Sequence, residues 1–326
     1  MSERLAFTVG AAESGMRLDH WLVTRLSDLS RTRLKALVDQ GRVRVDGHAS
    51  KAAHRLRAGE RIEAEIPPPP AATLEAEPIP LAILYEDDDV LVVDKPAGMV
   101  THPGAGRSTG TLAAAALAHA PGMASVGSHR RPGIVHRLDK GTSGLMVLAK
   151  TQRAYDALTA QLARRSVTRR YLCLAHGVPA HAEGVIDKPL ARDPRSRVRM
   201  AVAPPGKGKR AVTRFRVLER FSEAALVECQ LETGRTHQIR VHLASVGHPL
   251  LGDSTYGRGR RGPADPELAG SMDRLGGVAL HAAGLAFVHP SSGRPLEFAS
   301  PLPYRIEGLL SHLRRKNDST GSRRRS

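Results

Sequence analysis

A run of four prolines divides this chain of 326 residues into two parts of unequal length. The prolines occupy residues 67–70, at the start of the segment PPPPAATLEAEPIP, which spans residues 67–80. Consecutive prolines favour an extended conformation and cannot continue a helix or a central strand. We therefore predict a semi-rigid linker over residues 67–80, with one small compact unit before it and a larger one after it.

The segment before the linker alternates between helical and strand-like patterns. Residues 16–26 (MRLDHWLVTRL) and residues 30–41 (SRTRLKALVDQG) have the apolar spacing of amphipathic helices, and Gly41 is typical of a position just after a helix. The segments RVRVDGH and RLRAGERIEAEI then alternate as strands do. We predict a compact unit over residues 16–66 and interpret residues 1–15 as an N-terminal extension.

The charge of this first unit suggests RNA binding. Residues 16–66 hold 11 Lys and Arg residues against 7 Asp and Glu. Charged helix pairs are often only solvated surfaces, but the order helix, helix, RVxVDG, GExI resembles the S4 RNA-binding domain. That resemblance implies that the basic second helix and the strand after it face an RNA backbone. The residues predicted to contact RNA are Arg17, Arg31, Arg33, Lys35, Arg42 and Arg44.

The whole chain is strongly basic. Lys and Arg total 49 against 32 Asp and Glu, which gives a formal net charge of +17. Such a chain attracts polyanions, either nucleic acid or an anionic membrane. A membrane is the weaker option because no apolar run approaches the roughly 20 residues that span a bilayer. The first residues also lack the apolar segment of a secretory signal. We therefore expect a cytoplasmic, monomeric protein whose partner is RNA, without membrane contact.

The larger unit, residues 81–312, is rich in strand-like segments. Residues 168–179 have the pattern of a strand with Tyr171 and Cys173 on one face, and residues 210–221 and 224–234 alternate as two antiparallel strands. Helical spacing occurs in a few segments between strands, and in one of them Ile239 and Leu243 lie four apart, so that both can face the core. The pattern predicts an α+β fold, in which a mixed, largely antiparallel sheet carries helices on its flanks. We interpret residues 258–277 as an irregular excursion and residues 313–326 as a basic, disordered tail.

The stretch RPGIVHRLDKGTSGLMVLAK, residues 131–150, places charges beside an apolar run. Asp139 lies in a polar turn between the cations Arg137 and Lys140, and residues 145–149 have the composition of a buried strand. Most aspartates in such turns are simply solvated. A carboxylate on a rigid turn between two cations, however, can stay ionised in a partly dry pocket. We therefore predict that Asp139 is a functional carboxylate.

Three segments, in this order, resemble the motifs of the RluA/RluD-type RNA pseudouridine synthases. They are VVDKPAGMVTHPG, HRLDKGTSGLMVLAKT and GRTHQIRVHLA, and the pattern Arg169-x-Tyr171 is similar to the family's basic-x-Tyr motif. Together with the S4-like unit, the resemblance covers residues 16 to about 310. It departs at Gly141, where most members would have an acidic residue.

This resemblance implies that the chain isomerises uridine to pseudouridine within RNA, without a cofactor. Asp139 would act as the nucleophile or as the base that initiates glycal formation, and the sequence does not separate these two roles. Arg240, at the boundary of a helix over residues 237–245 capped by Thr236, would hold Asp139 ionised through a bidentate pair. Tyr171, which alone would as readily be a core ring, would pack on the flipped uracil.

The remaining site residues follow from the same resemblance. Arg137 would fill the gap left by the extruded base or grip its phosphate. Lys140 and Lys95 are predicted to give electrostatic support, and His136 is predicted to contact the substrate. The target implied by the S4-bearing, D-type members is 23S ribosomal RNA or the pre-50S particle.

Other functions fit the sequence less well. A purely RNA-binding protein of S4 type leaves the motifs around Asp139, Tyr171 and Arg240 unexplained. A glycoside hydrolase would usually need a paired second carboxylate, and none is evident near the motifs. Two isolated cysteines and the absence of HExxH argue against a metal site, and GAGRSTG is one residue too long for a dinucleotide fingerprint. We predict no metal and no cofactor.

Overall fold

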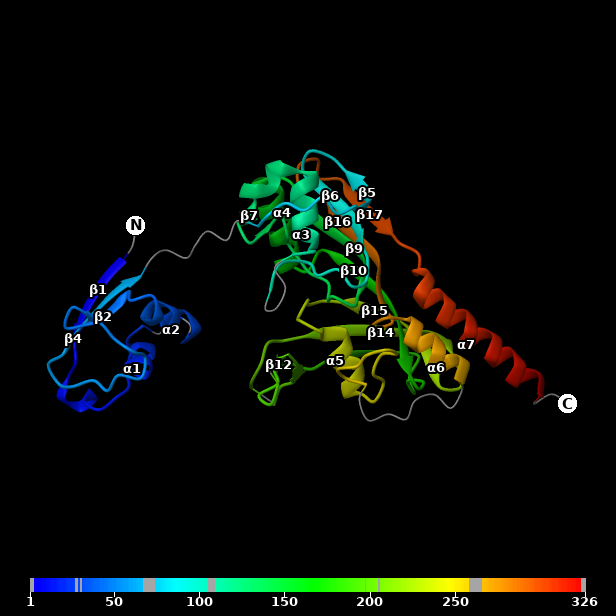
Figure 1. The fold of residues 1–326 in the computed structure, drawn as a ribbon. Coiled ribbons are helices and arrows are strands. Elements are labelled where there is room, and N and C mark those ends of the chain that lie inside the picture. The colour runs from blue at the N-terminus through cyan, green and yellow to red at the C-terminus, as the bar shows by residue number, and fades with distance from the viewer. Residues whose placement is uncertain are drawn as a thin grey trace. The chain divides into compact units, whose positions relative to one another are not determined.

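The chain divides into two compact units, Met1–Ala72 and Thr73–Ser326. They are seen in a computed structural model (Figure 1). The structure describes residues 3–26, 29, 31–66, 74–104, 109–196, 198–204, 206–257 and 266–323.

The first unit packs two helices against a four-stranded sheet. The helices are α1 (Leu18–Arg25) and α2 (Arg31–Asp39). The sheet runs in the order β1 (Glu3–Thr8), β4 (Arg61–Ile66), β2 (Val43–Val45), β3 (His48–Ala49), and a short 3₁₀ turn, η1, spans Ala11–Glu13. The core consists of fully buried apolar side chains from both layers, among them Leu18, Trp21, Leu22, Leu34 and Ile62.

The first strand corrects the prediction for the N-terminus. Residues 1–15 were interpreted as an extension, but β1 pairs antiparallel along the whole of β4, from Glu3 opposite Ile66 to Thr8 opposite Arg61. The Phe7 ring also meets Trp21 edge-on, with 5.7 Å between the ring centroids. The partner strand lies at the opposite end of the unit's sequence, so local periodicity does not reveal this pairing.

A nine-stranded sheet forms the frame of the described part of the second unit. Its order is β11-β14-β15-β10-β16-β9-β6-β5, with β17 paired to β16. The pair β16–β9 is parallel and the other pairs are antiparallel. This confirms the predicted mixed, largely antiparallel sheet. The strands are β5 (Ala82–Glu86), β6 (Val90–Lys95), β9 (Ser143–Ala149), β10 (Thr168–His176), β11 (Glu183–Asp187), β14 (Val212–Arg220), β15 (Ala224–Leu231), β16 (Leu280–Val288) and β17 (Pro295–Ala299).

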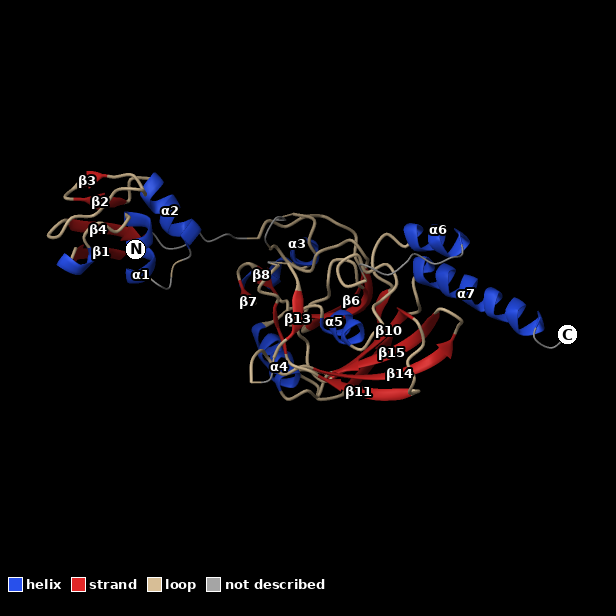
Figure 2. Ribbon diagram, turned by 90° about the horizontal axis from the view of Figure 1, so that it is seen from below, coloured by secondary structure: helices blue, strands red, loops and turns tan. Residues whose placement is uncertain are grey.

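Helices and two small hairpins surround this sheet (Figure 2). Helices α6 and α7 lie side by side, whereas α5 packs against β13 and β14. The helices are α3 (Leu112–His119), α4 (Gln152–Ala163), α5 (Gln238–Ser245), α6 (Pro266–Arg274) and α7 (Tyr304–Arg323), with a 3₁₀ segment η2 (Pro121–Ser125). The hairpins pair β7 (Gly127–Ser128) with β8 (Arg131–Pro132) and β12 (Leu190–Arg192) with β13 (Met200–Val202).

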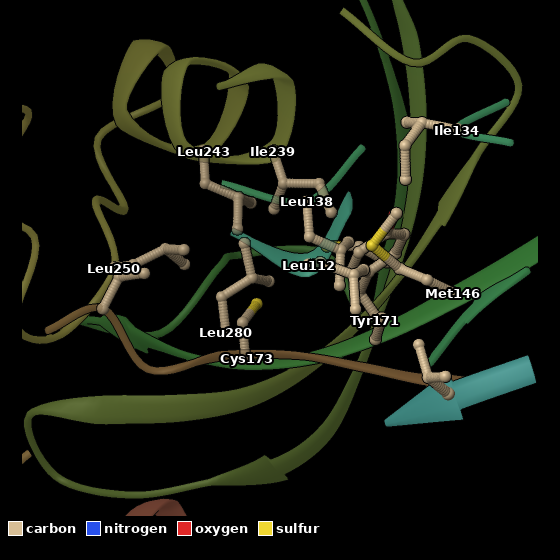
Figure 3. Packing of buried hydrophobic residues seen from close by; sticks show 14 of the residues in the cluster. Leu112, Ile134, Leu138, Met146, Tyr171, Cys173, Ile239, Leu243, Leu250 and Leu280 are labelled. Atoms are coloured by element: carbon tan, nitrogen blue, oxygen red, sulfur yellow. The ribbon is translucent and has the colours of Figure 1, made fainter. Parts of the chain in front are cut away.

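The main core lies between the sheet and helices α3 and α5. Ile239 and Leu243 point from α5 toward Cys173 and Leu280 of the sheet (Figure 3), which confirms that these two helix residues face the core. Because β9 is buried at all seven of its residues, the loop that precedes it is anchored on a rigid strand.

Three boundaries of the second unit differ from the predictions. Leu74 packs on its core and Glu77 accepts hydrogen bonds from the Gly110 N–H, so the unit begins before residue 81, while residues 67–73 lie outside the described residues. Within the predicted excursion, residues 266–274 form α6, and residues 258–265 lie outside the described part. Helix α7 extends to Arg323, where a disordered tail was expected from residue 313. Both helices are stabilised by a shared apolar cluster that includes Leu268, Leu275, Ile306, Leu309, Leu310 and Leu313.

Candidate active site

The Asp139 loop is held from both sides by backbone contacts. The Thr101 hydroxyl donates to the Leu138 carbonyl at 2.8 Å and accepts from the Leu138 N–H at 3.2 Å. The Gly98 N–H donates to the Lys140 carbonyl at 2.7 Å, and the Thr142 N–H donates to the carbonyl of Asp139 itself at 3.1 Å. The segment rich in Gly and Pro after β6 therefore fixes the carboxylate's position.

A residue from the first turn of α7 also supports this loop. Nη2 of Arg305 donates to the Gly141 carbonyl at 3.2 Å, and Nη1 donates to the carbonyls of Leu275 and Val278 at 3.1 and 3.2 Å. Local sequence patterns do not reveal this contact, because Arg305 lies far along the chain from the loop.

Arg240 reaches Asp139 from helix α5, as predicted, but with different geometry. Its Nη1 lies 3.3 Å from Oδ2 of Asp139, a single contact. The bidentate pair is made with Asp253, through Nε to Oδ2 at 2.7 Å and Nη2 to Oδ1 at 2.9 Å. The predicted bidentate pair with Asp139 is therefore wrong, because Asp253 takes two edges of the guanidinium and leaves the third for Asp139.

Asp253 is a site residue that sequence reasoning missed. Its side chain is fully buried and also accepts from the N–H groups of Thr255 and Tyr256. Burial raises the pKa of Asp253, but the hydrogen bonds and charge of Arg240 outweigh burial and hold that pKa below its ordinary value. The only local signal was the polar turn GDSTYG, which looks like any loop.

Tyr256 and His237 complete this side of the site. The Tyr256 hydroxyl lies 2.8 Å from Nδ1 of His237 and accepts from the Met200 N–H at 2.9 Å. The guanidinium of Arg240 lies over the Tyr256 ring at 5.1 Å, and Nε2 of His237 lies 3.9 Å from the Asp139 carboxylate. Burial lowers the pKa of His237.

The start of helix α5 differs from the prediction as well. Thr236 was predicted to cap it, but the N-cap is His237, in the left-handed conformation with φ +57°. Thr236 therefore does not cap the helix. The Gln238 side chain accepts a hydrogen bond from the Arg235 N–H at 3.0 Å. The tight turn at His237 directs its ring toward Tyr256, with 5.7 Å between the ring centroids.

Tyr171 enters the site from β10. Its side chain is 5% exposed and packs in the main core beside Met146 and Leu112 (Figure 3). Burial raises the pKa of the Tyr171 hydroxyl. The positive charge of Arg169 lowers this pKa and the negative charge of Asp139 raises it, and the net result is a raised pKa. Tyr171 therefore presents a neutral ring near the carboxylate.

A cavity of about 510 Å³ joins these residues. Asp139, Tyr171 and Arg240, taken from three separate motifs, all line it, so the structure brings the three predicted catalytic residues together. Exposed arginines at its mouth provide positive charge for an anionic ligand. They are Arg131, Arg137, Arg165 and Arg235.

The other predicted substrate residues take different positions. Arg137 and His136 line the cavity, whereas Lys140 is exposed and outside its lining. His136 accepts from the Val147 N–H at 3.2 Å, and burial lowers its pKa to about 3. Lys95 is 1% exposed, and its Nζ donates to the Pro96 and Met99 carbonyls, each at 2.9 Å.

Lys95 predicts a measurable pH dependence of stability. Burial lowers its pKa to about 7, despite the opposing charge of Asp139. The unfolded chain holds this proton up to a pH of about 10.4, so the folded state gains stability as pH rises from 7. Relative to Lys95→Met, the wild type should gain about 2 kcal/mol in free energy of unfolding between pH 7 and 9. Urea denaturation of both proteins at these two pH values measures this gain. If the difference in free energy of unfolding between the two proteins is the same at pH 7 and pH 9, the lowered pKa of Lys95 is contradicted.

The predicted RNA-contacting residues of the first unit are only partly described. The side chains of Arg31 and Arg33 lie outside what the structure describes. Three others form ion pairs within the unit: Arg17 with Asp19, Lys35 with Asp39, and Arg42 with Glu65. Arg44 is exposed on β2.

No group of three His, Cys, Asp or Glu residues in the described ranges is placed to hold a metal ion. The two cysteines, Cys173 and Cys229, are buried and free. Within the same ranges, none of the helices combines the length and apolar character that crossing a bilayer requires.

Comparisons with known proteins agree with this arrangement. Residues 89–245 match the family described as RNA pseudouridylate synthase, and residues 16–62 match the S4 domain. The chain is 44% identical over 312 residues to the uncharacterized RNA pseudouridine synthase YlyB of Bacillus subtilis, covering 96% of this chain and 99% of that protein. It is 46% identical over 320 residues to ribosomal large subunit pseudouridine synthase D of Nitrosomonas europaea, covering 98% and 90%.

A solved structure shares the fold of the second unit. Human RNA pseudouridylate synthase domain containing 4 superposes with a TM-score of 0.55 at 29% identity, and the match covers 72% of this chain and 93% of that one.

Proposed function

Since this chain belongs to the RNA pseudouridylate synthase family and isomerises uridine to pseudouridine in RNA, we propose that Asp139 is its catalytic carboxylate and large-subunit ribosomal RNA its substrate. One observation supports the first part most strongly: Asp139 lines the same cavity as Tyr171 and lies 3.3 Å from Arg240. Arg240 stays in place through Asp253, so it can stabilise the Asp139 carboxylate without closing over it.

The reaction conserves every atom of the nucleotide. Asp139 either attacks C1′ of the ribose or removes the C2′ proton to form a glycal. In both routes the C1′–N1 bond breaks and its electron pair leaves with the uracil. The base then rotates and C5 bonds to C1′, while the ester bond to Asp139 breaks in the first route or C2′ takes its proton back in the second. The C5 proton is lost and N1 takes up a proton. Tyr171, neutral and buried, would pack on the uracil while it turns.

The target base must leave its stack to enter the cavity. Unstacking costs a few kcal/mol, which contacts between the enzyme and the RNA have to offset. The exposed arginines at the mouth of the cavity suit the phosphates on either side of the flipped nucleotide. Arg137, next but one to Asp139, would occupy the gap that the base leaves in the RNA.

The proposed substrate is 23S ribosomal RNA, free or in the pre-50S particle, acted on by a monomer in the cytoplasm. The names of several relatives, the S4 domain and the net charge of +17 support this choice. The test is pseudouridine mapping on 23S and 16S transcripts and on pre-50S particles after treatment with the purified chain. New pseudouridine in the large-subunit RNA alone supports the proposal, and modification confined to 16S RNA would overturn it.

The S4 domain should contribute through phosphate contacts. Replacing Arg44 by Gln removes one exposed cation of the predicted surface and should weaken binding to 23S fragments. The slope of log K against log salt should fall by about 0.7 to 1. Filter binding at several salt concentrations measures this, with Arg61→Gln, an exposed arginine outside the predicted set, as the control. Equal slopes for Arg44→Gln and wild type would place the RNA on another surface.

A further inference from the structure

One buried cation in the cavity has no partner in the described protein. Arg169 lies on β10, two residues before Tyr171, is 8% exposed and lines the cavity. Its Nε is buried without a hydrogen-bond acceptor, and no ion pair of Arg169 forms among the described residues. An isolated charge in such a place costs several kcal/mol, and this cost is usually offset by a ligand or an acid.

The other arginines of the second unit's interior are satisfied differently. Arg240 contacts two carboxylates, Asp139 and Asp253. Nη1 and Nη2 of Arg305 donate to three backbone carbonyls, although its Nε, like that of Arg169, is buried without an acceptor. Arg169 therefore differs from both, because it is buried at the wall of a cavity rather than within a network of the protein's own acceptors.

The surroundings of Arg169 fix it in the cavity wall. The strand places Arg169 on the same face as Tyr171. Burial and, to a smaller extent, the charge of Arg169 lower the pKa of His136, and this low pKa keeps the His136 ring neutral. On another side it meets the backbone at Gly234, where an added Cβ would lie 2.7 Å from Nη1 of Arg169. These neighbours provide no negative charge.

We propose that Arg169 donates hydrogen bonds to a carbonyl oxygen of the flipped uracil and stabilises the negative charge that the base acquires. This inference rests on the proposed function. When the C1′–N1 bond breaks, its electron pair enters the uracil ring and spreads onto O2 and O4. A guanidinium carries hydrogen-bond donors and no acceptor, so Arg169 acts by hydrogen bonding and charge alone.

The position of Arg169 favours the base over the RNA backbone as its ligand. Phosphates remain at the surface of an RNA strand, where the exposed arginines at the mouth of the cavity can meet them. Arg169 is buried beside the ring of Tyr171, which is proposed to contact the uracil. A charge-assisted hydrogen bond in this dry place strengthens as the leaving base becomes anionic, so its effect belongs to the transition state.

The test compares Arg169→Gln and Arg169→Lys with Arg131→Gln, which removes an exposed cation at the cavity mouth. Single-turnover rates and dissociation constants are measured on a short 23S fragment. We expect Arg169→Gln to lower the rate about 100-fold with little change in affinity, as for loss of one oxyanion donor. Arg169→Lys should recover part of that rate, and Arg131→Gln should weaken binding with little change in the rate.

A substrate with a better leaving group separates a chemical role from a structural one. Fluorine at C5 withdraws electrons and stabilises the departing base, so the deficit of Arg169→Gln should shrink on RNA that carries 5-fluorouridine at the target. Fluorine also blocks the final loss of a C5 proton, so the rate on this RNA is measured as the disappearance of N1-linked 5-fluorouridine and not as pseudouridine formation. An equal deficit on both substrates, a normal rate, or a loss confined to affinity would each overturn the proposal. If the wild type modifies no RNA at all, both the proposed function and the role of Arg169 fail. If the wild type is active and Arg169→Gln is equally active, only the proposed role of Arg169 is overturned.

Discussion

Replacing Asp139 by Asn should reduce pseudouridine formation by at least about 10⁴-fold while leaving RNA binding intact. Asn has the same shape as Asp and can still accept a hydrogen bond from Arg240, but it cannot form the ester or remove the proton. Arg240 should keep its position because Asp253 holds it through two hydrogen bonds. The cavity therefore stays formed in the variant, and the loss reports on the carboxylate itself.

The measurement is single-turnover pseudouridine formation on a 23S fragment, with the dissociation constant taken on the same RNA. Asp156→Asn, an exposed position of α4, serves as the matched control and should behave as the wild type does. An Asp139→Asn protein that keeps more than about one hundredth of the wild-type rate would show that the carboxylate belongs to another residue.

Replacing Gly144 by Ala should lower the free energy of unfolding by at least about 3 kcal/mol. Gly144 is the second residue of strand β9 and has φ +115°, and a Cβ there would lie 2.4 Å from the Ala282 carbonyl oxygen and 2.5 Å from the Ala282 nitrogen. Both contacts are with backbone, at the parallel pairing of β9 with β16, so a rotamer change cannot relieve them. Relief requires separating the two strands.

Gly293→Ala is the control for backbone strain alone. Gly293 also has positive φ, +69°, but nothing lies within 4 Å of the added Cβ, so this change should cost only about 1 kcal/mol. Urea denaturation of both variants measures the difference. Similar costs for the two would mean that the sheet opens freely at Gly144.

Local patterns were enough to predict the elements that carry the site. The apolar run from 145 to 149 correctly predicted a buried strand, and the alternation in β10 placed Tyr171 and Cys173 on one face. The spacing of Ile239 and Leu243 likewise predicted the inner face of α5. These predictions succeed because burial on a regular element leaves a periodic trace in the sequence.

Contacts between distant segments left no such trace. Asp253 competes with Asp139 for the same guanidinium, and nothing in the sequence indicates which acid takes two hydrogen bonds. The pairing of β1 with β4 and the support from Arg305 also depend on segments that are far apart in the chain. The left-handed turn at His237 was missed because a non-glycine residue rarely adopts it.

The place of β16 in the sheet sets an order of events during synthesis. This strand lies between β10 and β9, yet it is translated after both of them and after every other strand of this sheet except β17. Until it emerges, nothing joins the β5-β6-β9 part of the sheet to the β10-β15-β14-β11 part, and β9 and β10 each lack the partner that they have in the folded enzyme. Asp139 precedes β9 in the first part, whereas Tyr171 belongs to the second. If these two residues act together as proposed, the nascent enzyme stays inactive until its last strands join the two parts.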